Sequence, residues 1–161
     1  MCSFGTDESI RRVVEQYSPT LLRLAMTRLS SPADAEDAVQ EVFLRLLTAR
    51  PRFRDGEHEK AWLIRATLQR AGDIRRAAAR RDLPLEEAEQ AAAPPGEGPS
   101  LLLSAVQALP EKYSAVIHLY YYEGYSIKEI ARLLALPAPT VGTRLARGRE
   151  RLRELLKEEE A

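Results

Sequence analysis

Residues 126–147 read SIKEIARLLALPAPTVGTRLAR, and this stretch decides how the second half of the chain folds. Ser126 followed three residues later by Glu129 is a capping box, which predicts the start of a short helix. A turn comes next, and Pro137 and Pro139 both suit the first turn of a new helix, where a missing backbone N–H costs nothing. A short helix, a tight turn and a longer basic helix form the helix-turn-helix pattern, which favours binding in the DNA major groove.

The second helix of this pattern is predicted to run to about Glu158, with its arginines on the face opposite its apolar side chains. Arginine can address guanine edges, and threonine can meet a methyl group or a phosphate. Gly142 either allows a close approach to DNA or makes no contact, and both interpretations stay open. The candidate upstream DNA-binding residues are Thr140, Gly142, Thr143, Arg144, Arg147 and Arg151. The alternative is a helical hairpin whose arginines are only solvated.

The charges of the chain cancel overall but are unevenly distributed. The 161 residues carry 24 basic and 24 acidic side chains. Residues 49–81 hold ten arginines and lysines against four acidic residues, whereas residues 82–100 hold five acidic residues and no basic one. Because DNA binding depends on local basic stripes and the counterions they release, the zero net charge does not exclude a nucleic-acid partner.

Three helices are expected in the first half of the chain. A serine–proline pair at 18–19 predicts a helix start, and a second pair at 31–32 precedes the clearest amphipathic pattern, residues 35–47. Pro51 ends that helix, and a third helix is expected over about 57–81.

In the second half, residues 101–109, capped by Ser100, and residues 110–122 are each predicted as a helix. The expected apolar stripe of the latter is Tyr113, Val116, Ile117, Tyr120 and Tyr121. Residues 83–100 are acidic and rich in proline and glycine, so they are expected to be a flexible linker. The predicted fold class is therefore all-α, with a helical bundle over 1–82 and a helix-turn-helix domain over 101–161.

Few residues suit a catalytic or metal site. Cys2, His58 and His118 cannot fill the four positions of a structural zinc site. The chain has no glycine-rich phosphate loop, and no second histidine completes a metalloprotease motif after His58. No apolar stretch approaches the roughly 20 residues that span a bilayer, and no signal peptide is visible. We therefore expect no enzyme activity, no cofactor or metal, no membrane insertion, and a cytoplasmic location.

Three segments, taken together and in order, resemble the extracytoplasmic-function (ECF) sigma factors of bacterial RNA polymerase. The first is DAEDAVQEVFLRLL at 34–47, and the second is AWLIRAT at 61–67 followed by DIRR at 73–76. The third begins with LPEKY at 109–113 and continues through HLYYYEGYSIKEIA at 118–131 to TVGTRLAR at 140–147. The resemblance covers nearly the whole chain outside the expected linker.

The resemblance implies that the helix over 35–47 binds core RNA polymerase at the clamp helices of its β′ subunit, with further contacts to the β subunit. The implied polymerase-binding residues are Asp37, Gln40, Glu41 and Leu44. Leu44 is an apolar side chain beside carboxylates on the face opposite the core, which suits a partner helix with basic residues and an apolar spot. A plain solvated face is the alternative.

The resemblance further implies that the helix over 57–81 reads and melts the downstream (−10-type) promoter element. Phe53 is expected to line a pocket for an unstacked base, while arginines hold the displaced strand. The candidate downstream DNA-binding residues are Phe53, Arg65, Gln69, Arg70, Arg75, Arg76 and Arg80. Gln69 stands where the family usually has asparagine, which leaves base preference there open. Trp62 suits the core better than a stacking surface.

The function implied is that of a sigma factor, which leaves nucleotidyl transfer to the polymerase and recognises promoter DNA at −10-type and −35-type elements. The family commonly has a cognate anti-sigma factor, so such a partner is possible. One alternative is a helix-turn-helix regulator that acts without polymerase, and another is a helical adaptor that binds only protein.

Overall fold

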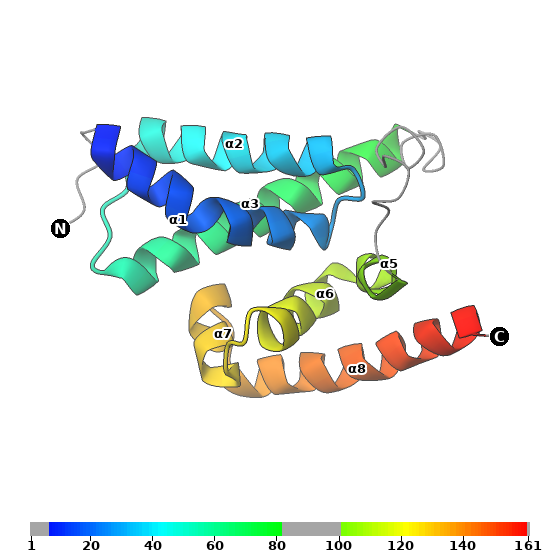
Figure 1. The fold of residues 1–161 in the computed structure, drawn as a ribbon. Coiled ribbons are helices and arrows are strands. Elements are labelled where there is room, and N and C mark those ends of the chain that lie inside the picture. The colour runs from blue at the N-terminus through cyan, green and yellow to red at the C-terminus, as the bar shows by residue number, and fades with distance from the viewer. Residues whose placement is uncertain (1–6, 82–100, 161) are drawn as a thin grey trace.

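The computed structural model describes residues 7–81 and 101–160, and the regular elements of these residues are all helices. The first half contains α1 (Asp7–Met26), α2 (Pro32–Ala49) and α3 (Gly56–Arg80), each packed against the other two. Figure 1 shows these helices as one layer above the helices of the second half. The predicted linker over 83–100, which includes the predicted cap Ser100, lies outside the described residues.

The first helix begins earlier than the sequence predicts. It starts at Asp7, so the serine–proline pair at 18–19 is not a helix start, and Pro19 lies inside the helix. Val13 and Leu21, on either side of this proline, are both fully buried. Since burial of an apolar face stabilises a helix more than local propensity does, the packing outweighs the backbone hydrogen bond that proline cannot make.

The predicted starts of the next two helices are confirmed. Ser31 caps α2 by accepting a hydrogen bond from the Asp34 amide at 3.3 Å. Asp55 caps α3 by accepting one from the His58 amide at 2.8 Å. The amphipathic pattern of α2 is confirmed as well, because its buried residues are Ala35, Ala38, Val39, Val42 and Leu46.

The described residues 101–160 form four α-helices and one π-helical turn. They are α5 (Leu101–Ala108), α6 (Glu111–Ile117), the π-helix η1 (His118–Tyr122), α7 (Ile127–Leu134) and α8 (Ala138–Glu160). The long helix α8 packs against α5, α6 and α7. The predicted helix-turn-helix is confirmed as α7 and α8.

The apolar stripe predicted for 113–121 is wrong beyond Ile117. Leu119 is buried instead, while Tyr121 is 54% exposed. The cause is η1, in which the Glu123 amide donates to the His118 carbonyl five residues back at 3.1 Å. A π turn holds more residues than an α turn, so the spacing of 3.6 no longer predicts which side chains face the core.

The two halves share one contiguous apolar core, and α7 packs directly against α3. In Figure 1 this places α6 and α7 between α3 and α8. Consequently α8 presents its outer face on the side of the molecule remote from the first three helices. Among the described residues, no helix is long and apolar enough to cross a membrane.

Candidate nucleic-acid interface

The turn before α8 fixes the direction of this helix. Ser126 and Glu129 exchange two hydrogen bonds of 3.1 Å between side chain and backbone, which confirms the predicted capping box of α7. Ala135 then adopts a left-handed conformation, with φ 55°, and the chain enters α8. Val141 and Leu145 of α8 are buried, so the opposite side of this helix faces solvent.

That solvent-facing side carries the predicted upstream residues, which we call the α8 surface: Thr140, Gly142, Thr143, Arg144, Arg147 and Arg151. Thr143, Arg147 and Arg151 are exposed, and the other members are half-buried. A groove of about 330 Å³ runs along this surface and is also lined by Lys112 and Tyr113 of α6. The sequence analysis missed these two residues because only the tertiary structure brings α6 beside the start of α8.

Tyr113, which lines this groove, is surrounded by basic side chains. Its ring centroid lies 5.1 Å from Lys112 Nζ and 5.4 Å from Arg151 Cζ. Burial would raise the pKa of the Tyr113 hydroxyl, but Lys112, Arg147 and Arg151 together lower this pKa below its ordinary value. Such a concentration of positive charge around a groove suits phosphate groups.

The two glycines of α8 have different surroundings. A Cβ added at Gly142 would meet no atom within 4 Å, so packing within the chain does not require glycine there. A Cβ added at Gly148 would lie 3.0 Å from Cγ1 of Ile117 and 3.3 Å from Cβ of Tyr113. Gly148 therefore allows α8 to approach α6 closely, a role that the sequence analysis missed.

The predicted downstream residues on α3 form a second basic surface, the α3 surface: Arg65, Gln69, Arg70, Arg75, Arg76 and Arg80. Arg65, Gln69, Arg76 and Arg80 are exposed, whereas Arg70 and Arg75 are half-buried. Arg65, Gln69 and Arg76 are spaced by four and seven residues, so they share one side of α3.

Phe53 is placed differently from the expectation that it lines an open pocket. Its ring is only 4% exposed and packs edge-on against His58 and Trp62, with centroid distances of 5.2 Å and 6.1 Å. The structure therefore makes Phe53 part of the core beneath the loop before α3. Trp62 is partly buried against the same core, and Arg45 Cζ lies 5.9 Å from its ring centroid.

The predicted polymerase-binding residues form a third surface, the α2 surface: Asp37, Gln40, Glu41 and Leu44. All four are exposed, and Leu44 is 59% exposed although it is a large apolar residue. Glu41 is ion-paired with Arg70 of α3, whose Nη2 lies 3.3 Å from Oε1 of Glu41. The α2 and α3 surfaces therefore meet at this pair, which the sequence analysis did not foresee.

An ion pair between a buried glutamate and an exposed arginine joins α3 to α1. Glu59 of α3 is almost fully buried, and Oε2 of its carboxylate accepts a hydrogen bond from Arg12 of α1 at 3.2 Å. Burial, followed by the nearby Glu59, raises the pKa of Tyr17 to about 12. The sequence analysis missed this network, because a glutamate inside a helix is usually exposed.

The part of the chain that the structure describes contains no group of three metal-ligating side chains. Its chemistry is that of guanidinium, amide, hydroxyl and carboxylate groups on three helix surfaces. Such groups bind phosphates, base edges and protein side chains.

Two known families match the chain, one in each half. The family described as Sigma-70 region 2 matches residues 13–81, and the family described as Sigma-70, region 4 matches residues 100–152. SigW of Bacillus subtilis, an ECF RNA polymerase sigma factor, is 30% identical over 172 residues, which cover 96% of this chain and 92% of SigW. The chain belongs to the ECF sigma factor family.

This sigma factor is also similar to others of known sequence. The ECF RNA polymerase sigma factor SigE of Mycolicibacterium smegmatis is 33% identical over 156 residues, which cover 89% of the chain but only 60% of SigE. CarQ of Myxococcus xanthus, an RNA polymerase sigma factor, is 29% identical over 161 residues, which cover 96% of this chain and 92% of CarQ. As a sigma factor, the chain directs promoter-specific transcription initiation.

Two solved structures have the same fold as this sigma factor. RpoE of Bartonella quintana, solved with the anti-sigma factor NepR, superposes with a TM-score of 0.71 at 23% identity, over 93% of this chain and 98% of RpoE. CnrH, solved with the cytosolic domain of CnrY, superposes with a TM-score of 0.66 at 25% identity, over 96% of this chain and 91% of CnrH. Both matches include the two halves of the chain, so the fold is shared beyond the separate domains.

Proposed function

We propose that the three surfaces divide the work of promoter recognition among three helices. The α2 surface binds the clamp helices of the polymerase β′ subunit, the α3 surface binds and helps to open the −10-type element, and the α8 surface binds the −35-type element. The observation that carries this assignment is that each surface faces solvent on a helix whose opposite side is buried in the shared core. The nucleotidyl transfer is left to the polymerase, with which the chain acts in the cytoplasm.

The chemistry of each surface fits its proposed partner. Arginine and threonine at the start of α8 match base edges and phosphates in a major groove. The basic residues of α3 match the phosphates of a strand that is displaced as the duplex opens. The acidic residues around the exposed Leu44 match a basic helix with an apolar contact point. A cognate anti-sigma factor that covers these surfaces is part of the proposal, because RpoE was solved with such a partner.

Transcription with purified core polymerase on a library of random upstream and downstream elements tests the proposal. We expect the chain to start RNA synthesis at a defined sequence set, with one preferred element for each DNA-binding surface. Duplex binding without stimulated synthesis would favour a regulator that acts without polymerase. Binding to polymerase with neither DNA preference nor synthesis would favour an adaptor and would overturn the assignment of both basic surfaces.

A further inference from the structure

The π-helix η1 places three consecutive tyrosines at the surface of the second half. Tyr121 is 54% exposed and Tyr122 is 67% exposed. The ring of Tyr120, which is also exposed, meets the Tyr121 ring edge-on at a centroid distance of 4.9 Å. Because π turns occur frequently at functional sites, this aromatic cluster is a candidate binding surface.

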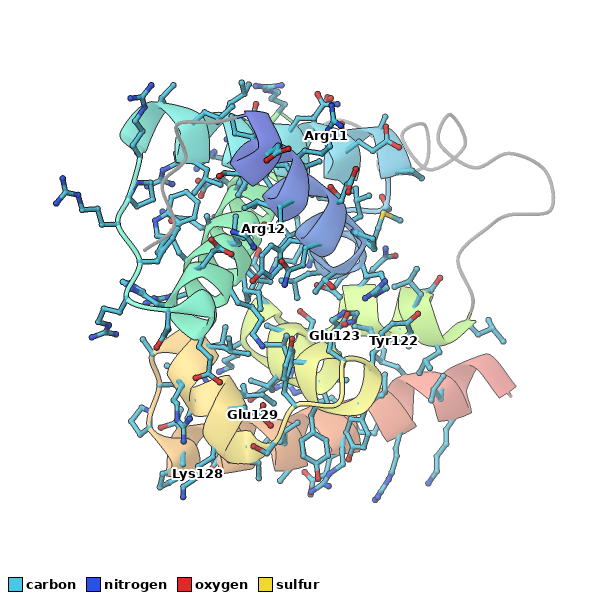
Figure 2. The ribbon with its side chains drawn as sticks, turned by 60° about the vertical axis from the view of Figure 1, so that its left-hand side comes forward. Arg11, Arg12, Tyr122, Glu123, Lys128 and Glu129 are labelled. Atoms are coloured by element: carbon cyan, nitrogen blue, oxygen red, sulfur yellow. The ribbon has the colours of Figure 1, made fainter. Side chains whose placement is uncertain are left out.

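Two arginines from other helices hold these rings in place. Arg149 of α8 donates a hydrogen bond of 3.1 Å to the Tyr121 hydroxyl. The Tyr122 ring stacks on His118 at a centroid distance of 5.1 Å, and Arg23 Cζ lies 5.5 Å from the Tyr122 centroid. Figure 2 shows Tyr122 at the edge of the second half that faces α1. Rings held in this way lose little conformational freedom when a ligand binds to them.

Two basic side chains of α8 lie beside this cluster. Arg149 and Arg153 are both exposed, and their spacing of four residues places them on one side of the helix. That side differs from the α8 surface, because Arg147 is two positions before Arg149 and an α-helix turns such neighbours to opposite sides. Glu150 and Glu154 line the groove on the Arg147 side. We call the cluster and its two basic neighbours the η1 surface: Tyr120, Tyr121, Tyr122, Arg149 and Arg153.

Exposed aromatic rings beside guanidinium groups suit a single strand of nucleic acid. Unpaired bases stack on aromatic rings, and basic side chains along a groove or helix bind the phosphates. The carboxylate of Glu123 is only 9% exposed and accepts hydrogen bonds from Arg23, so it repels a bound phosphate little. An acidic protein segment would use the two arginines, whereas the exposed rings favour planar bases.

We propose that the η1 surface binds single-stranded RNA. Bases stack on Tyr121 and Tyr122, while Arg149 and Arg153 bind the phosphates. The strand is RNA because the reaction that a sigma factor starts produces RNA, and the opened DNA strand has its own proposed site on α3. Tyrosine hydroxyls can also bond the ribose 2′-OH, the group that distinguishes RNA from DNA. The inference goes beyond the proposed function, since it needs none of the three surfaces assigned there.

The first test measures binding of the full chain to a fluorescent oligouridylate of about 12 nucleotides, a length typical of such sites, by anisotropy without polymerase. Tyr121→Leu and Tyr122→Leu keep an apolar side chain but remove the aromatic ring, whereas Tyr121→Phe keeps the ring. We expect each leucine variant to bind about fivefold or more weakly, the low end of the loss for one stacked base. Tyr121→Phe should stay within about threefold of the wild type, because it loses only a hydroxyl.

The contribution of charge is tested by a second pair of variants. Arg149→Gln removes a phosphate contact, so it should weaken binding about twofold to fivefold and reduce the dependence on salt concentration. Arg11→Gln is the matched control, because it removes the same charge at an exposed position of α1, and it should change neither measurement. An oligodeoxyuridylate of the same length lacks the 2′-OH and should bind about threefold more weakly than the RNA.

Photo-crosslinking locates the strand on the wild-type chain. An oligouridylate that contains thiouridine is irradiated with the full chain, and the attached peptide is identified by mass spectrometry. We expect attachment at η1 or at the part of α8 that carries Arg149 and Arg153. Attachment to α3 alone would contradict the inference, because the strand would then occupy the surface proposed for opened DNA.

Equal RNA affinities of the wild type and the leucine variants, with unchanged helicity by circular dichroism, would overturn the inference. Equal losses in Arg149→Gln and Arg11→Gln would also overturn it, because net charge alone would then explain the binding. DNA binding as tight as RNA binding would exclude RNA as the specific ligand. An oligoglutamate that binds as tightly as the RNA would assign the surface to an acidic protein instead. Promoter-directed synthesis with core polymerase is measured separately, so a failure of RNA binding leaves the proposed function standing.

Discussion

At the scale of single residues, accessibility and local charge decide which side chains can meet a partner. Arg144 is half-buried at the edge of the groove that Lys112 and Tyr113 help to line. Leu44 is exposed although it is a large apolar residue, and Gly148 lies where α8 contacts Ile117 and Tyr113. Each of these positions makes a distinct prediction.

Arg144→Ala is expected to weaken binding to the upstream element by about 1–3 kcal/mol, the range for an arginine that contacts a base edge or phosphate. Affinity for core polymerase should stay the same, because α2 is remote in sequence and lies in the other half of the fold. Anisotropy with a duplex upstream element and co-elution with core polymerase measure the two effects. Equal loss of both would indicate unfolding and would contradict the assignment.

Leu44→Asp is expected to reduce the affinity for core polymerase about tenfold or more, roughly 1.4 kcal/mol, because a charge replaces an apolar contact at an interface. Binding to the upstream element should be unaffected. Ala33→Asp is the control, since it adds the same charge at an exposed position in the first turn of α2. Unchanged polymerase binding by Leu44→Asp would remove the α2 surface from the proposal.

Gly148→Ala is expected to lower the free energy of unfolding by about 1–2 kcal/mol, because its Cβ would overlap Ile117 in a close-packed contact. Gly142→Ala, where the space is open, should raise the free energy of unfolding by up to about 1 kcal/mol, because alanine favours a helix more than glycine does. Urea unfolding of both variants measures the difference. Equal stability changes at the two positions would contradict the close approach of α6 and α8.

At the scale of elements, local signals set most helix boundaries. Side-chain caps begin α2, α3 and α7, and each of these three signals lies within four residues of sequence. Pro19 and η1 are the exceptions. In both places the packing of the whole molecule decides the backbone: α1 continues through a proline, and the chain widens into a π turn that exposes Tyr121.

Ser126→Ala is expected to destabilise the helix-turn-helix by about 1 kcal/mol, since it removes one of the two capping hydrogen bonds of α7. Upstream-element binding should weaken in proportion, because α7 fixes the direction of α8. Thermal unfolding and duplex binding are the measurements. Ser126→Asp, which keeps an acceptor for the capping hydrogen bond, should have nearly the stability of the wild type. If both substitutions destabilised the chain equally, the capping role would be contradicted.

At the scale of the whole molecule, the two halves share one core, and charged residues join them at its edge. The sequence predicts two helical units with basic surfaces. A run of basic residues, however, does not reveal which carboxylates will pair with it in the folded chain. The family resemblance supplied the proposed partners of the α2, α3 and α8 surfaces. The boundary between the halves became visible only through the tertiary structure.

Acidification is expected to weaken the contact between the two halves. Burial lowers the pKa of His118 below its ordinary 6.5. Burial alone would raise the pKa of Glu123, but hydrogen bonds from Arg23 and His118 bring it below 4.5. Both pKa values are depressed in the folded chain, so their stabilisation is complete above about pH 6.5 and is lost as the pH falls through each lowered value.

Energy transfer between dyes attached at Ala33→Cys on α2 and Lys157→Cys on α8, in a chain whose Cys2 is replaced by serine, is measured from pH 8 to pH 3 and follows this opening. We expect the efficiency to fall below pH 6.5 in the wild type as His118 takes up a proton, and to fall further below pH 4.5 as Glu123 takes up another. Glu123→Gln should lose the second fall but keep the first, because burial still lowers the pKa of His118 in this variant. An equal fall below pH 4.5 in the variant would contradict the role of the Glu123 carboxylate.

The sequence alone was enough to predict the all-helical class, the caps of α2 and α7, the buried face of α2 and the helix-turn-helix. These features depend on residues that lie within one or two helical turns of each other. The covalent chain alone brings such residues together. Long-range packing accounts for the rest: α1 continues through Pro19, Phe53 is buried, and Gly148 lets α8 approach α6. It also pairs Glu41, Glu111 and Glu123 with arginines of other helices. Those outcomes depend on contacts between residues far apart in the chain, and helix periodicity carries no information about such contacts.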